Sequence, residues 1–145
     1  MKISYSSGMR VSECASLRVR NIIFKTKIHS DHTIDRSKGK NGGVIGRPFL
    51  LEPEILEEVK DYCKSKGMID DDCNILVDHE TRLFPSSWEK KKGDPVSIRN
   101  IHKIVKAAAE NSLDKGLIPN LEKSFRPHSF RHHFATHWYD KGLKI

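Results

Sequence analysis

Residues 126–142 read Arg126-Pro127-His128-Ser129-Phe130-Arg131-His132-His133-Phe134-Ala135-Thr136-His137-Trp138-Tyr139-Asp140-Lys141-Gly142, and this stretch decides how the chain is expected to be organised. It reads as a helix that begins at its proline, with successive side chains roughly 100° apart. Phe130, Phe134 and Trp138 recur every four residues and should face a core. His128 and Arg131 lie roughly opposite and can reach one small target. That pair suits a phosphate oxyanion, although a solvated basic face explains this segment equally well.

Composition indicates a globular domain with a polyanionic partner. The chain has 145 residues, of which 37% are hydrophobic, enough for a core and too many for wholesale disorder. Its 26 Lys and Arg outweigh 19 Asp and Glu, which gives a net charge of +7. Such an excess favours DNA, RNA or an acidic membrane surface, because neutralised phosphates release counterions.

The sequence carries no sign of a membrane protein. No apolar run approaches the roughly 18 residues that can span a bilayer, and no signal peptide is recognised. The three cysteines, Cys14, Cys63 and Cys73, are odd in number and lack C-x-x-C spacing. We therefore expect reduced thiols in a cytoplasmic protein that has no membrane partner.

An arginine follows turn chemistry near the N-terminus. Ser6-Ser7-Gly8 predicts a turn, and the residues after Arg10 fit one face of a short helix through Leu17. Arg10 would then lie at the turn-to-helix junction, where backbone donors and the helix dipole also favour an anion. The alternative is an ordinary exposed arginine.

Residues 21 to about 51 change to a strand-like pattern. Apolar residues at 22–24, at 28 and 34, and at 44–50 predict three short antiparallel strands. The second and third would be joined by Ser37-Lys38-Gly39-Lys40-Asn41-Gly42-Gly43, a basic, glycine-rich hairpin tip. Its lysine could enter a groove and reach a backbone oxygen, or the tip could be an ordinary solvated loop.

Two amphipathic helices complete the expected elements. Pro53 begins one that ends near Gly67, with Tyr62 on its core side, and Ser97 caps another that runs to about Asn111. With the three strands, this predicts a mainly helical α+β domain that spans residues 1–145.

The turn with Arg10, the hairpin with Lys38 and the helix with His128 and Arg131 together resemble one known family. They look like the catalytic domain of the tyrosine recombinases, the phage-integrase class of site-specific DNA recombinases. The matching segments are Ser7-Gly8-Met9-Arg10-Val11-Ser12-Glu13 with Leu17 following, Lys38-Gly39-Lys40, and His128-Ser129-Phe130-Arg131-His132-His133-Phe134-Ala135-Thr136-His137. They cover almost the whole chain, in the expected order.

The resemblance implies a role for each matching residue. Arg10 and Arg131 would hold the non-bridging oxygens of the scissile phosphate and stabilise the pentavalent transition state. His128 would hydrogen-bond the same phosphate and assist proton transfer.

A lysine of the hairpin, Glu13 and His132 would also take part in this site. Lys38 would be the general acid that protonates the departing 5′ oxygen. Lys40 is the alternative if the hairpin aligns differently with the family pattern. Glu13 and His132 would support the site. No metal and no other cofactor is expected, because the arginines supply the positive charge.

The family's nucleophilic tyrosine, and the Leu-Gly-His block before it, would follow this helix, and Ile145 comes before either. Tyr139 lies about 12 Å beyond Arg131 along a continuous helix, at 1.5 Å per residue. A nucleophile must come within roughly 3–3.5 Å of the phosphorus. We therefore expect no nucleophile in this chain, and no counterpart of the family's N-terminal DNA-clamp domain.

Three functional hypotheses remain. The chain could supply the phosphate-binding part of an enzyme that recombines or integrates DNA through a 3′-phosphotyrosine. It could instead be a non-catalytic remnant that binds DNA sites or pairs with an intact enzyme. Both imply double-stranded DNA and further recombinase protomers as partners. The third is a zinc site at His128/His132 or His133/His137, but no Glu follows the first histidine and no cysteine pair completes it.

Overall fold

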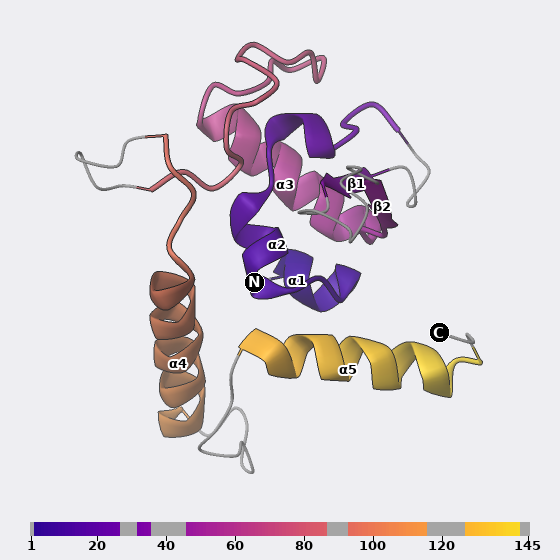
Figure 1. Cartoon of the computed structure of the whole chain (residues 1–145), viewed down its shortest axis with the longest axis vertical. Coiled ribbons are helices and arrows are strands. Elements are labelled where there is room, and N and C mark those ends of the chain that lie inside the picture. Colours follow the sequence, from indigo (N-terminus) through magenta and orange to yellow (C-terminus); the bar gives the residue numbers. More distant parts are fainter. Residues whose placement is uncertain (1, 27–31, 36–45, 87–92, 116–126, 143–145) are drawn as a thin grey trace, which may run out of the picture.

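The computed structural model describes residues 2–26, 32–35, 46–86, 93–115 and 127–142. These residues form mainly helices with one small antiparallel sheet, which confirms the predicted α+β class (Figure 1). The elements in chain order are α1 (Lys2–Ser7), α2 (Val11–Ser16), the 3-10 turn η1 (Val19–Asn21), β1 (His32–Asp35), β2 (Gly46–Phe49), α3 (Pro53–Ser65), α4 (Ile98–Asp114) and α5 (Pro127–Asp140).

The sheet contains two strands in the described part of the chain. β1 and β2 pair antiparallel, with His32 opposite Phe49 and Ile34 opposite Arg47. The strand expected at residues 22–24 was wrong. The N–H of Ile22 donates to Val19 within η1 and the N–H of Ile23 donates to the ring of His32, so neither enters a strand ladder. The remaining apolar positions of that prediction, 28, 44 and 45, lie outside the described residues.

The core forms where α2, η1, the sheet and α3 meet. Its most completely buried side chains are Met9, Leu17, Val19, Ile34, Leu51, Cys63 and Leu83. The helix predicted from Pro53 is confirmed, and Ile55, Leu56, Val59 and Cys63 form its buried face. Tyr62, which was expected in the core, is only half-buried at its edge, where its ring packs against Phe84.

Helix α4 begins where it was predicted. The hydroxyl oxygen of Ser97 accepts a hydrogen bond from the N–H of Asn100 at 3.1 Å, and the helix continues past Asn111 to Asp114. Of the large apolar residues in α4, Val105 is fully buried, whereas Ile98 and Ile104 remain exposed. Figure 1 shows why, because α4 stands to one side of the other helices. No helix in the described ranges is long and apolar enough to cross a bilayer.

Helix α5 lies alongside α1, a helix that the sequence pattern did not predict (Figure 1). The Tyr5 hydroxyl and His133 Nε2 are hydrogen-bonded at 3.0 Å, and their rings stack at 5.1 Å. The stripe of Phe130, Phe134 and Trp138 was expected to be core, but all three side chains are only half-buried. Phe134 of this stripe does contact the rest of the protein, but so does Arg131, which was expected on the opposite face, because both reach Gly8. Periodicity also overestimated how much protein covers the stripe.

Candidate functional site

A tight turn between α1 and α2 presents Arg10 to solvent. Gly8 adopts a φ of +61°, a left-handed conformation that glycine tolerates without cost, and its N–H donates to Ser4. Met9 is buried immediately afterwards and anchors the turn. Arg10 has extended backbone and occupies the N-cap position of α2, with 62% of its side chain exposed. The predicted position of Arg10 at a turn-to-helix junction is therefore confirmed.

Glu13 holds this turn from the first turn of α2. Its Oε2 accepts a hydrogen bond from the N–H of Arg10 at 2.7 Å, which satisfies one of the free donors at the helix start. The same oxygen accepts a second hydrogen bond from Arg47 Nη2 at 3.0 Å. Its other oxygen lies 3.5 Å from Arg10 Nη1. Glu13 thus contacts both arginines while its own side chain is largely shielded from solvent.

Arg131 connects α5 to the same turn. Its Nη1 donates to the carbonyl oxygen of Gly8 at 2.9 Å, although 123 positions separate the two residues. The ring of Phe134, one turn further along α5, lies directly against Gly8. The two arginines singled out from the sequence are therefore brought to one place, since the contact of Arg131 is two residues from Arg10.

The two histidines of the predicted site lie in the first half of α5. His128 and His132 are both exposed, and their rings meet edge to face at a centroid distance of 4.6 Å. Within the described residues, no hydrogen bond joins His128 to Arg10 or Arg131. Lys38 and Lys40 lie outside the described residues.

Arg47 is a member of this cluster that sequence reasoning missed. It lies on β2 opposite Ile34, and its side chain is 29% exposed beside Glu13. No local pattern could have found it, because a single arginine in a strand gives no periodic signal and its partner is 34 positions away. Three guanidinium groups and one carboxylate give the cluster a net positive charge, which is suited to an anion.

The described structure contains no other strong candidate for chemistry. Its histidines, cysteines and acidic residues form no group of three that could hold a metal ion. Burial raises the pKa of the Cys14 thiol, partly offset by a hydrogen bond from Ser4, and burial raises the pKa of Cys63 to about 12. A high thiol pKa disfavours the thiolate, so neither cysteine is prepared to act as a nucleophile.

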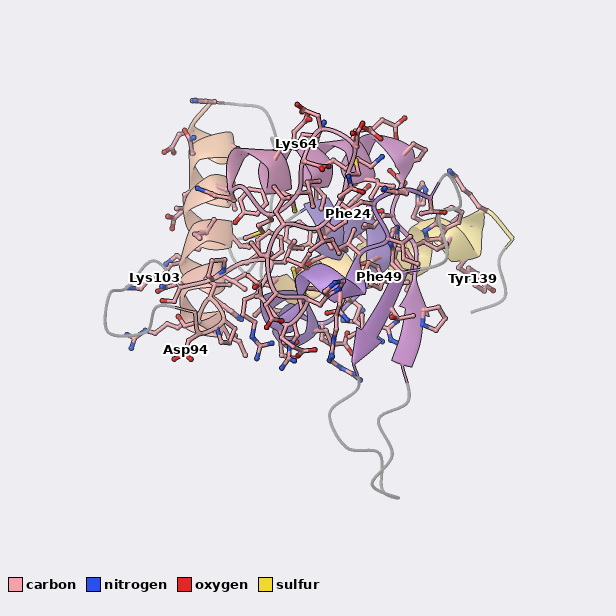
Figure 2. All side chains as sticks on the ribbon, turned by 90° about the horizontal axis from the view of Figure 1, so that it is seen from above. Phe24, Phe49, Lys64, Asp94, Lys103 and Tyr139 are labelled. Carbon is pink, nitrogen blue, oxygen red and sulfur yellow. The ribbon has the colours of Figure 1, made fainter. Side chains whose placement is uncertain are left out.

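Tyr139 lies apart from the arginines. Helix α5 is continuous from Pro127 to Asp140, and the Tyr139 side chain is 73% exposed at its outer end (Figure 2). The helix break that would be needed to bring Tyr139 back toward Arg131 is absent from α5.

The chain matches one protein family along its whole length. The model of the phage integrase family matches residues 1–145. The chain belongs to the phage integrase family. Curated relatives include a tyrosine recombinase of Pseudothermotoga lettingae, 26% identical over 145 residues, and the tyrosine recombinase XerA of Pyrococcus furiosus, 28% identical over 141 residues. These alignments cover 100% and 97% of the chain but only 41% and 40% of the relatives, so the integrase-family chain spans about two fifths of their length.

Solved structures show the same fold. A crystal structure of XerA recombinase superposes with a TM-score of 0.67 at 19% identity, covering 98% of this chain and 43% of that one. The Tn1549 transposon integrase in complex with transposon right end DNA superposes with a TM-score of 0.66 at 18% identity, covering 98% and 45%. The integrase-family chain thus has the fold of part of a tyrosine recombinase.

Proposed function

We propose that this chain supplies the phosphate-binding part of a site-specific DNA recombinase. The observation that carries the proposal is the hydrogen bond from Arg131 to Gly8, which brings a cation of α5 to the turn that presents Arg10. Family membership over residues 1–145 supports the reaction class, because the matching relatives are tyrosine recombinases.

In the proposed mechanism, two arginines hold the scissile phosphate. Arg10 and Arg131 donate to its non-bridging oxygens, since a planar guanidinium matches two oxygens at once. Negative charge grows on these oxygens as the phosphorus becomes five-coordinate, so fixed cations stabilise the transition state more than the ground state. His128 hydrogen-bonds the same phosphate and assists proton transfer, with His132 and Glu13 supporting the site.

Cleavage requires a nucleophile and a general acid. A tyrosine oxygen attacks the phosphorus, the bond from phosphorus to the 5′ oxygen breaks, and a lysine protonates the departing oxygen. We assign that lysine to Lys38, with Lys40 as the alternative. We place the tyrosine outside residues 1–145, on further residues of the protein or on a partner chain. Attack of a new 5′ hydroxyl on the 3′-phosphotyrosine then breaks the bond from phosphorus to the tyrosine oxygen, which rejoins the strands and releases the tyrosine.

Double-stranded DNA is the proposed partner. A net charge of +7 favours a polyanion, and the Tn1549 integrase with the same fold was solved in complex with transposon right end DNA. Association with further recombinase protomers on DNA is part of the proposal, and native mass spectrometry of the protein with a duplex tests it.

The phosphate-binding proposal is tested by the salt dependence of duplex binding. Fluorescence anisotropy with a labelled 30-base-pair duplex gives the slope of log K against log salt for the wild type, Arg10→Ala and Arg131→Ala. Each variant should reduce the slope by about one, the change expected when one phosphate contact is lost. Lys64→Gln is the matched control, because Lys64 pairs with Asp71 and lies far from β1 and β2 (Figure 2). Equal slopes for the wild type and both arginine variants would contradict the proposal.

The position of the nucleophile is tested with a nicked duplex. Incubation with the wild type, followed by denaturing gel electrophoresis, should reveal no covalent protein–DNA adduct. An adduct that disappears in Tyr139→Phe or Tyr5→Phe would show that a tyrosine of this chain is the nucleophile.

A further inference from the structure

Arg47 shares the carboxylate of Glu13 with Arg10. We propose that Arg47 is a positioning residue that engages Glu13 and thereby keeps the guanidinium of Arg10 available for phosphate. This inference rests on the proposed function, because it describes how one of the phosphate-binding arginines is kept free.

The distances at Glu13 rank its three partners. Its Oε2 lies 2.7 Å from the N–H of Arg10 and 3.0 Å from Arg47 Nη2, both ordinary charge-assisted hydrogen bonds. The Arg10 guanidinium comes only to 3.5 Å of Oε1, at the outer limit of a hydrogen bond. Glu13 therefore holds the backbone of Arg10 firmly and its side chain weakly.

Burial explains this ranking. The Arg47 side chain is 29% exposed, that of Glu13 is 15% exposed, and that of Arg10 is 62% exposed. Solvent screens the pair of Arg47 and Glu13 less than the pair of Arg10 and Glu13, so the first is the stronger ion pair.

Without Arg47, the carboxylate of Glu13 would pair with the guanidinium of Arg10 instead. Arg10 and Glu13 are spaced i,i+3 at the start of α2, a spacing at which opposite charges attract. Neutralising Arg47 changes the summed charge of Arg10, Glu13 and Arg47 from +1 to zero. Arg10 would then gain a full hydrogen bond by turning onto Glu13, and its guanidinium would be less available to an external phosphate.

Two simpler roles for Arg47 make different predictions. It could only tie β2 to α2, or it could contact the phosphate itself. In either case, removal of Glu13 as well would not restore the salt slope, because neither role frees a guanidinium for phosphate. If Arg47 acts by occupying Glu13, then Glu13→Gln should suppress Arg47→Gln. The glutamine amide oxygen can still accept the N–H of Arg10, so the helix cap is retained.

The experiment compares duplex binding by five variants of the full chain. The salt slope and affinity for the 30-base-pair duplex are measured for the wild type and for Arg10→Ala, Arg47→Gln, Arg47→Lys, Glu13→Gln/Arg47→Gln and the control Lys64→Gln. Arg47→Gln should lose about one unit of slope and roughly tenfold in affinity, matching Arg10→Ala. The double variant should bind more tightly than Arg47→Gln and regain the lost unit of salt slope. Arg47→Lys should bind with intermediate affinity, because lysine keeps the positive charge but lacks the planar guanidinium.

The outcomes separate this inference from the proposed function. If Arg10→Ala and Arg131→Ala bind like the wild type, the proposed function fails. If those two variants bind weakly while Arg47→Gln binds like the wild type, the positioning role of Arg47 fails alone. A double variant as weak as Arg47→Gln also overturns that role. Circular dichroism checks folding, and if Arg47→Gln does not fold, the binding of the double variant decides the question.

Discussion

The ring of Phe134 covers Gly8 so closely that a Cβ atom built at position 8 would lie 2.4 Å from Cδ1 of that ring. Gly8 also has a φ of +61°, which residues with a side chain rarely adopt. One residue therefore allows both the turn that presents Arg10 and the close approach of α5.

Gly8→Ala should destabilise the protein. The left-handed backbone alone costs roughly 1–2 kcal/mol for a residue with a Cβ, and displacement of the Phe134 ring adds to that. Urea unfolding, monitored by tryptophan fluorescence, measures the loss in the free energy of unfolding. Gly8→Ala/Phe134→Leu should recover part of it, because leucine removes the ring. An unchanged unfolding midpoint in Gly8→Ala would contradict the packing of α5 on the turn.

Arg131→Ala should weaken DNA binding far more than it weakens the fold. The substitution removes one charge-assisted hydrogen bond to Gly8 at a half-buried position, a cost of about 1–2 kcal/mol in the free energy of unfolding. Far-ultraviolet circular dichroism should be unchanged, and the salt slope of duplex binding should fall. A melt that shows an unfolded chain at room temperature would mean that Arg131 is mainly structural.

Phe134→Ala should lower the free energy of unfolding by less than the same substitution at a fully buried phenylalanine. Complete burial predicts a loss of about 3–5 kcal/mol, whereas the half-buried ring leads us to expect about 1–3 kcal/mol. Chemical denaturation of the variant measures the difference. Val59→Ala on the buried face of α3 is a suitable comparison, because its side chain is almost wholly enclosed. A loss above the upper value for Phe134→Ala would indicate that α5 is covered more completely than the structure shows.

The buried Cys63 thiol should make stability fall at alkaline pH. Burial raises its pKa from 9.0 to about 12 in the folded protein, so between these values the folded state keeps a proton that the unfolded state releases. Its contribution to stability is complete below about pH 9 and is lost as pH rises toward 12. Urea midpoints of the wild type and Cys63→Ala, measured from pH 8 to 11, should converge as pH rises. A constant difference between the two midpoints across this pH range would contradict a raised pKa of Cys63.

Local features of the chain could be read without a structure. Pro53 and the 3.6-residue period after it located α3, and Ser97 located the start of α4, because caps and periodicity act over a few neighbouring residues. Gly8 and Arg10 were likewise placed at a turn and a helix start, since the left-handed turn and the helix start depend on adjacent residues.

Other elements depended on distant partners. Helix α1 is rich in serine, a weak helix former, and its residue Tyr5 is hydrogen-bonded to His133 on α5. The apolar residues at 22–24 looked like a strand, but the N–H of Ile22 donates to Val19 in η1 and that of Ile23 donates to the ring of His32. Pattern alone could not foresee α1, because a contact 128 positions along the chain supports it. Nor could it foresee the turn and side-chain hydrogen bonds of Ile22 and Ile23, which leave no periodic signal.

The sequence by itself determined the family, the fold class and the residues around which the candidate site is built. Their types and local spacing carry that information, as the match over residues 1–145 reflects. Only the tertiary structure decided that Arg131 reaches Gly8 and that Arg47 reaches Glu13. Those contacts join residues 123 and 34 positions apart, and packing of α5 and β2 against one turn brings them within hydrogen-bonding distance.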